Sequence, residues 1–102
     1  MSDIRQARKA LVRRILEGAG TASSFNRLAA FNNRGLSESL GALVDRVARH
    51  PYRVTDEDIA AAKAAGLTED QVFEIVVCAA IGQATRQYDA AFAALEAVTG
   101  KE

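Results

Sequence analysis

The stretch VTDEDIAAAKAAGLTEDQV, residues 54–72, contains the starts of two helices separated by a glycine. In each start a threonine that can cap the helix, Thr55 or Thr68, follows an apolar residue and precedes another by four positions. This spacing is a hydrophobic staple, in which the two apolar side chains pack across the cap. At the second start, Gln71 can also reach back to the cap amide and complete a capping box. The stretch therefore predicts two helices that are separated at Gly66.

The N-terminal half follows the same helical periodicity. Apolar residues recur every three or four positions over residues 4–16, and the opposite face of that segment is basic. We predict that this first helix ends at residues 18–20, Gly-Ala-Gly, with a glycine in the left-handed conformation. A second, shorter helix is predicted over about residues 22–31. Ser37 is placed to cap a third helix, which the His-Pro pair at residues 50–51 closes.

The last helix is predicted to run from Glu69 to about Val98. Gly82 lies in its middle, where a glycine costs roughly 1 kcal/mol relative to alanine, and we predict that close approach of another helix compensates. One apolar stripe is predicted to be buried along this helix: Phe73, Val76, Val77, Ala80, Ile81, Ala84, Tyr88, Ala91, Phe92 and Leu95. No strand pattern or linker is present. The sequence therefore predicts a single all-α domain over residues 1–102, a compact bundle of about five helices with a long C-terminal helix.

The composition restricts the class of protein. With 102 residues, the chain is long enough for one domain with a modest core. Apolar residues make up 49% and charged residues 25%, as in ordered globular proteins, and no apolar run reaches the length of a membrane span. A single cysteine allows no internal disulfide, and the N-terminus lacks the apolar stretch of a secretory signal. These features favour a cytoplasmic location and no membrane partner.

Charge is unevenly distributed along the chain, although the formal net charge is zero. Residues 1–53 carry ten Lys or Arg and four Asp or Glu, a balance of +6, whereas residues 54–102 carry three and nine, a balance of −6. The two halves can attract each other within one fold or pair between subunits, but we favour the interpretation as ordinary solvated faces, because single surface charges contribute little. Apolar content is high for so short a chain, and small residues surround Gly82. We therefore expect a homo-oligomer.

No complete catalytic or metal-binding motif is present. A metal site needs several converging ligands, and the chain has one histidine, His50, and one cysteine, Cys78. No serine is spaced to form a triad with His50, which we interpret as a helix-end residue. The Gly-Ala-Gly segment lacks the lysine of a nucleotide-binding loop. Cys78 lies in an apolar run and is predicted to be a buried structural thiol. We therefore expect neither a metal nor another cofactor.

The two helices predicted around Gly66 also have the outline of a helix-turn-helix motif. A small residue, Ala62, precedes the turn glycine by four positions. In such a motif the early positions of the second helix face the bases of DNA. Here those positions include Glu69, Asp70 and Glu74, whose negative charges would face phosphates. DNA binding is therefore the least favoured function, and a nucleic-acid partner is not expected.

Residues 40–95 contain four features in a fixed order. A helix is followed by VTDEDI, an alanine-rich helix ending at Gly66, the start LTEDQVFEIV and a long helix rich in small residues. In this order they resemble the alkylhydroperoxidase D-like superfamily, which includes carboxymuconolactone decarboxylases. The resemblance implies the all-α fold of that superfamily. Its redox members use a glutamate about a dozen residues before a C-x-x-C pair, with a histidine four residues after the second cysteine.

The present chain departs from the redox pattern of that superfamily. Glu74 matches the glutamate, but Arg86 and Asp89 stand where the two cysteines would be, and Ala93 stands in place of the histidine. Cys78 lies roughly 12 Å from Arg86 along the helix axis, too far to join that position. Dithiol chemistry within one chain is excluded because it needs two thiols. The resemblance therefore implies a member without redox activity.

Three interpretations of the segment TRQYD, residues 85–89, stay open: a structural surface, the remnant of a binding pocket, or a catalytic site. Arg86 and Asp89 are one helical turn apart and can form a surface ion pair, and Tyr88 falls on the predicted buried stripe. The first functional hypothesis is a small binding or assembly module. The alternative is a decarboxylase- or isomerase-like enzyme that acts on a small carboxylic acid. In that enzyme Arg86 would hold the carboxylate, and Glu74 and Asp89 are the acid–base candidates.

Overall fold

The computed structural model describes residues 2–99, and all regular elements among these residues are helical. The prediction of an all-α bundle of about five helices with a long final helix is confirmed. A short 3-10 helix, η1, lies between the third and fourth α-helices. The elements are α1 (Ser2–Glu17), α2 (Ser24–Asn32), α3 (Glu38–Arg49), η1 (Pro51–Arg53), α4 (Asp56–Ala64) and α5 (Glu69–Thr99).

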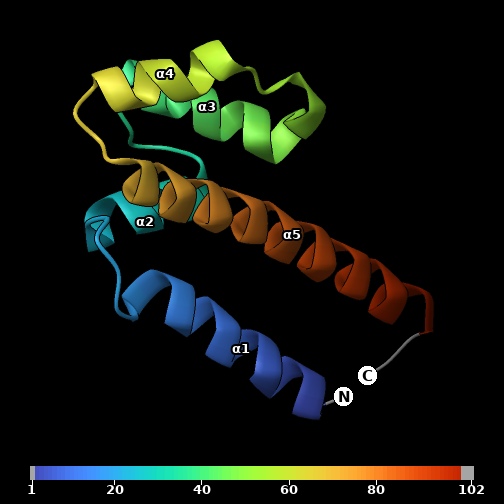
Figure 1. Ribbon diagram of the computed structural model, residues 1–102. Coiled ribbons are helices and arrows are strands. Elements are labelled where there is room, and N and C mark those ends of the chain that lie inside the picture. The colour runs from blue at the N-terminus through green and yellow to red at the C-terminus, as the bar shows by residue number, and fades with distance from the viewer. Residues whose placement is uncertain (1, 100–102) are drawn as a thin grey trace.

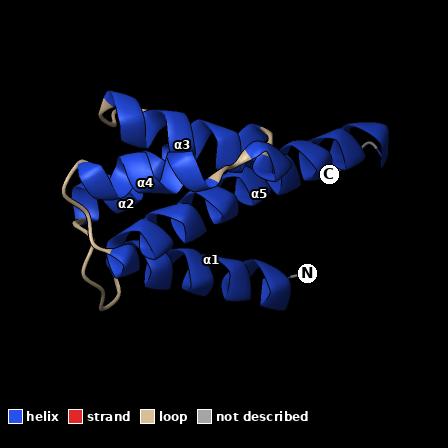
Figure 2. Cartoon of the chain, turned by 45° about the horizontal axis from the view of Figure 1, so that its top comes forward, coloured by secondary structure: helices blue, strands red, loops and turns tan. Residues whose placement is uncertain are grey.

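The long helix α5 is the axis of the molecule (Figure 1). α3 and α4 form a pair along one side of α5, α2 packs against its N-terminal half, and α1 lies along the other side. The core lies among α2, α3, α4 and the first half of α5. Figure 2 shows that the C-terminal end of α5 extends past the other helices. The buried core residues are Ala22, Ala30, Leu40, Leu43, Val44, Ala62, Val72, Ile75, Cys78 and Ala79.

The buried stripe predicted for α5 is wrong. The buried residues of this helix are Val72, Ile75, Cys78, Ala79 and Gly82. Phe73, the first residue of the predicted stripe, is 68% exposed, and several later members of the stripe are exposed as well: Ala80, Ala84, Tyr88, Ala91 and Leu95. Residues 72–81 are apolar around most of the helix, so periodicity does not select one face. The buried face includes the smallest side chains, which allow α2 to approach closely.

Gly82 lies at the place where the C-terminal end of α2 meets α5. A Cβ atom added to Gly82 would overlap the backbone of Phe31, with only 2.7 Å to its carbonyl carbon and 2.8 Å to its Cα. The prediction that another helix approaches closely at Gly82 is confirmed. Arg86, one turn further along α5, donates a hydrogen bond from Nη1 to the carbonyl oxygen of Phe31 at 2.6 Å. That carbonyl is one of the last in α2, which lack a partner within the helix.

α1 ends at Glu17, close to the predicted end at residues 18–20, but it does not end with a glycine in the left-handed conformation. The glycines with positive φ among residues 2–99 are Gly35 at 88° and Gly66 at 106°. The predicted left-handed glycine within residues 18–20 is therefore wrong. Gly18 instead donates from its N–H to the carbonyl oxygen of Arg14 at 2.9 Å, which continues the helical bonding by one residue.

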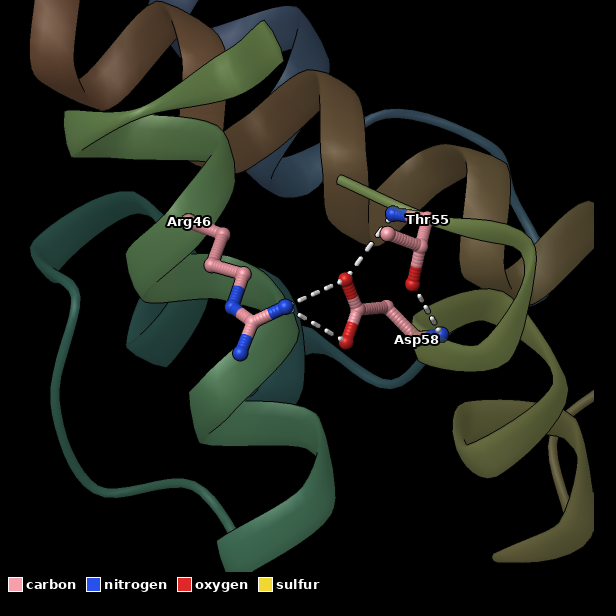
Figure 3. Close-up of polar contacts among 3 residues, drawn as sticks. All are labelled: Arg46, Thr55 and Asp58. Carbon is pink, nitrogen blue, oxygen red and sulfur yellow. Dashed lines mark hydrogen bonds and ion pairs between the residues drawn. The ribbon is translucent and has the colours of Figure 1, made fainter. Parts of the chain in front are cut away.

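The two predicted threonine caps begin α4 and α5. The N–H of Thr68 donates to Oε1 of Gln71 at 2.9 Å, and the N–H of Gln71 donates to Oγ1 of Thr68 at 3.1 Å, so the predicted capping box is confirmed. Thr55 and Asp58 form a second capping box, which was not predicted from the sequence (Figure 3). Ser37 occupies the N-cap of α3, but its side chain makes no cap bond to the described residues, so that predicted side-chain cap is wrong.

Asp58 also joins α4 to α3 (Figure 3). Nη1 of Arg46 donates to both of its carboxylate oxygens, at 3.0 and 3.2 Å. The backbone N–H of Thr55 donates to Oδ2 of Asp58 at 2.9 Å. These donors hold the pKa of Asp58 below its ordinary value of 3.8, with the Thr55 backbone bond as the largest cause and the charge of Arg46 as a further one.

Thr55→Ala is expected to lower the free energy of unfolding by about 1 kcal/mol, as for other lost N-caps. The substitution removes the Oγ1 acceptor for the N–H of Asp58 and leaves the contact between Asp58 and Arg46 in place. Urea denaturation at one fixed protein concentration measures the effect. Thr99→Ala is the control, since its hydroxyl donates only to the Glu96 carbonyl near the end of α5. Equal midpoints for the two variants would contradict the prediction.

Candidate functional site

Glu74 holds the loop between α1 and α2. Its carboxylate oxygens accept hydrogen bonds from the N–H of Thr21 at 3.0 and 3.1 Å, from the hydroxyl of Thr21 at 3.1 Å and from the N–H of Ala22 at 2.8 Å. Gln71, on the same helix, donates from Nε2 to the Thr21 carbonyl oxygen at 3.1 Å. A Cβ atom added to Gly20 would lie 2.8 Å from Oε1 of Glu74. The loop is therefore fixed against the first turns of α5.

The same bonds set the protonation state of Glu74. The backbone N–H groups of Thr21 and Ala22 hold the pKa of the Glu74 carboxyl below its ordinary value of 4.5, and they outweigh burial, which raises it. The carboxylate is therefore ionised at neutral pH, and its oxygens are occupied by the loop. A general acid needs a raised pKa and a free approach to the substrate. The geometry does not favour Glu74 for proton transfer.

Arg86 and Asp89 do not form the ion pair that their spacing predicts. Arg86 donates to the Phe31 carbonyl oxygen at 2.6 Å and to Oε1 of Gln83 at 2.9 Å. Asp89 instead pairs with Arg8 of α1, with 3.2 Å between Nη2 and Oδ1. Because Glu74 contacts the α1–α2 loop, Arg86 the end of α2 and Asp89 the helix α1, the three candidate residues are not brought into one site.

Aromatic side chains lie beside the Arg8–Asp89 pair. The guanidinium of Arg8 stacks on the ring of Tyr88, with 4.7 Å from Cζ to the ring centroid, and that of Arg5 stacks on Phe92 at 5.5 Å. The rings of Tyr88 and Phe92 are nearly parallel, with centroids 6.1 Å apart. Cation–π contacts of this kind contribute about 0.5–1 kcal/mol at exposed sites. The TRQYD segment thus attaches α1 to α5, which matches the structural interpretation of the segment.

Cys78 is 1% exposed, so the prediction of a buried thiol is confirmed. Burial raises the pKa of the Cys78 thiol, an effect that the positive charge of Arg27 opposes. Its Sγ lies 3.6 Å from the carbonyl oxygen of Ile15, to which it donates a weak hydrogen bond. His50 is an exposed residue at the C-cap of α3. Among the described residues, no group of three or more His, Cys, Asp or Glu side chains could hold a metal ion.

The positions that would read DNA bases in a helix-turn-helix are partly occupied. Gln71 and Glu74 are bonded to the Thr21 region of the loop. Glu69 and Asp70 are exposed and carry negative charge at the start of α5. A surface with these charges repels phosphates, so the geometry adds nothing in favour of a DNA-binding function.

A cavity of about 220 Å³ lies between the C-terminal end of α1, α2 and α5. Arg27 of α2 lies at this cavity and is only 8% exposed. Its Nη1 donates to the carbonyl oxygens of Gly18 at 2.9 Å and Ile15 at 3.4 Å, so Arg27 caps the C-terminal end of α1. The lining residues are Arg14, Ile15, Ala19, Arg27, Phe73, Glu74, Val77 and Cys78.

Sequence reasoning missed Arg27 because nothing local distinguishes it. Arg27 is a charged residue in a short helix, between the apolar residues Phe25 and Leu28, and this pattern predicts a solvent-facing side chain. In the structure the pattern is reversed, since Phe25 is 70% and Leu28 is 50% exposed. The position of the Arg27 side chain depends on the carbonyl groups of Gly18 and Ile15 at the end of α1, which are 9 and 12 residues away in the sequence.

No family model, curated protein or solved structure matches this chain. None of the helices described within residues 2–99 is both long and apolar enough to cross a membrane.

Proposed function

We propose that this chain is an assembly module without redox activity that works as a homo-oligomer. The observation that carries the proposal concerns two helical segments: among the described side chains, none of residues 3–17 in α1 and none of residues 83–99 in α5 is buried. The second segment alone extends for roughly 26 Å at 1.5 Å per residue. Helices in proteins are stabilised mainly by packing of their apolar face, so these segments need a further surface.

Large apolar side chains are exposed along both segments. They include Ile4 and Leu11 of α1, and Tyr88, Leu95 and Val98 of α5. The radius of gyration is 15.3 Å, compared with about 13 Å for a compact domain of 100 residues. Singly exposed apolar residues are common on monomers, but a row of them on extended helices is typical of an interface.

A second copy of this chain is the occupant that the charges favour. α1 carries five Lys or Arg against two acids, whereas residues 83–99 carry Asp89 and Glu96 against one arginine. The two surfaces already pair once within the chain, through Arg8 and Asp89. A two-fold arrangement would let the exposed face of α1 in each copy pack against the exposed face of the C-terminal half of α5 in the other, a self-complementary interface.

Light scattering tests this proposal. We expect a mass of two or more chains at low salt and a larger monomer fraction at high salt, because salt screens the charge pairing. Leu95→Glu should weaken association about tenfold or more, since it places a charge in an apolar contact. Ala60→Glu makes the same change in charge at an exposed residue of α4, outside both segments, and is the control. A monomer at both salt concentrations would refute the proposal.

The proposal keeps the resemblance of residues 40–95 to the alkylhydroperoxidase D-like superfamily, as a member without thiol chemistry. Its support is the single cysteine, which is buried and has a raised pKa. A cytoplasmic setting, which the single cysteine favours, belongs to the same proposal. The alternative enzyme gains no support from its named residues, because Glu74 and Arg86 are occupied by backbone groups of other elements.

A further inference from the structure

We propose that the cavity between the end of α1 and α5 binds a small monocarboxylic acid with a short apolar chain, and that Arg27 holds its carboxylate. This inference does not depend on the assembly proposal. The cavity is lined by neither Arg86 nor Asp89, and it lies at the opposite end of α5 from the exposed segment 83–99.

Arg27 is held in one place by its bonds to α1. Nη1 donates to the carbonyl oxygens of Gly18 and Ile15, at 2.9 and 3.4 Å, and the residue is 8% exposed. These bonds use one side of the guanidinium group. A planar guanidinium that is fixed in this way is preorganised to bind a second group at its other side.

The other side of Arg27, formed by Nε and Nη2, is its free edge. Nε is buried and has no hydrogen-bond partner among the described residues. Nη2 donates to none of these residues either, and it is not among their buried unpartnered atoms, so it stays accessible. A buried N–H without an acceptor costs about 1–3 kcal/mol, and native structures contain few. Two parallel N–H groups on one edge match the two oxygens of a carboxylate.

The cavity has the size and the walls for a short acid. Its volume of about 220 Å³ is below the roughly 300–1,000 Å³ of pockets for drug-sized ligands. Ile15, Phe73 and Val77 provide apolar walls. Apolar walls favour a carboxylate with a short hydrocarbon chain over inorganic phosphate, which has no apolar part to bury.

The charges around the cavity also favour an anion. The lining side chains include Arg14 and Arg27 against one acid, Glu74, a formal balance of +1. The oxygens of Glu74 are already bonded to the N–H groups of Thr21 and Ala22 and to the Thr21 hydroxyl. Glu74 therefore does not serve as the partner of the free edge, since no hydrogen bond joins it to Arg27 among those of the described residues.

The test is an NMR titration of the full, ¹⁵N-labelled chain, with the Nε–H signal of Arg27 as the readout. The probes are hexanoate, hexanamide and inorganic phosphate. We expect hexanoate to shift this signal saturably and hexanamide, which has the same chain without the charge, to bind at least about tenfold more weakly, as for loss of a charged hydrogen bond. No saturable shift with hexanoate, or equal binding of hexanamide or phosphate, would overturn the proposal.

Variants distinguish an effect on ligand binding in the cavity from an effect on the fold. Val77→Phe fills the cavity and leaves Arg27 unchanged, and it should abolish hexanoate binding while the helical circular dichroism is retained. Arg14→Gln should weaken binding, with Arg13→Gln as the matched control, because Arg13 is the exposed neighbour that does not line this cavity. Wild-type affinity in folded Val77→Phe would place the ligand elsewhere. Equal losses in Arg14→Gln and Arg13→Gln would show only a general charge effect and would also overturn the site.

Discussion

Gly82→Ala is expected to lower the free energy of unfolding by about 3 kcal/mol, at the upper end of the usual range for overpacking. The added methyl group would overlap the Phe31 backbone, 2.7 Å from its carbonyl carbon. A flexible side chain could rotate away, but a helix end cannot. α2 would have to move off α5, and the bond from Arg86 to the Phe31 carbonyl oxygen would be lost with it. The expected fall in Tm is roughly 12 to 24 °C.

The matched control for this substitution is Gly41→Ala in α3. A Cβ atom added to Gly41 would have its nearest neighbours at 3.8 and 3.9 Å, both in Leu36, which is ordinary contact. The same change should therefore raise the stability by about 0.5–1 kcal/mol, because alanine loses less entropy in a helix. Urea denaturation of both variants at one protein concentration tests the pair. Similar midpoints for the two would mean that α2 does not press on Gly82.

The helix starts could be predicted because their signals are local. Thr68 and Gln71 need only each other to form the capping box, so the sequence suffices for it. The same logic applied to Ser37 failed, because a suitable residue at the N-cap does not guarantee a bond. Gly82 was interpretable because a glycine inside a helix needs a compensating contact. The buried face of α5 could not be predicted, because residues 72–81 are apolar on most sides of the helix. Packing against α2 and α3 determines which face is buried.

The candidate site was harder to predict because its contacts are distant in sequence. Glu74 bonds to Thr21, 53 residues earlier, and Arg86 bonds to Phe31, 55 residues earlier. From the sequence alone, a glutamate and an arginine on a long helix can be catalytic, ligand-binding or structural. Their partners decide among these roles, and the partners are backbone groups. The role of Arg27 could not be predicted for the same reason, because its acceptors are carbonyl oxygens at the end of α1.

Glu74→Gln is expected to lower the stability at pH 7 by about 2 kcal/mol, the usual loss when a charged hydrogen-bond acceptor is replaced. Glutamine has the same shape but one oxygen. With the amide oxygen in the place of Oε1, the NH₂ group would replace Oε2, so the bonds from the N–H and the hydroxyl of Thr21 to Oε2 would be lost and those to Oε1 would lose their charge. The loop would then be held to α5 by neutral hydrogen bonds alone, including the one from Gln71. Glu69→Gln, an exposed acid in the same helix, is the control and should change stability by less than about 0.5 kcal/mol.

The pH dependence of stability separates this role of Glu74 from a purely steric one. Its pKa in the folded chain is below the ordinary value of 4.5, so the folded state binds the proton less readily than the unfolded state. The stabilisation is therefore complete above pH 4.5 and is lost as the pH falls through the folded-state pKa. Wild type should lose stability steeply in this acidic range, with Asp58 contributing in the same direction because its pKa is also lowered.

In Glu74→Gln this titration is absent, so the decline below about pH 5 should be shallower and the two stability curves should converge in acid. Chemical denaturation at a series of pH values measures the difference between the curves. Glu69→Gln should run parallel to wild type, because Glu69 holds no loop. A Glu74→Gln curve that stays parallel to wild type through the acidic range would mean that the carboxylate is not held in its charged form by the loop. Convergence would assign to Glu74 the attachment of the α1–α2 loop to α5.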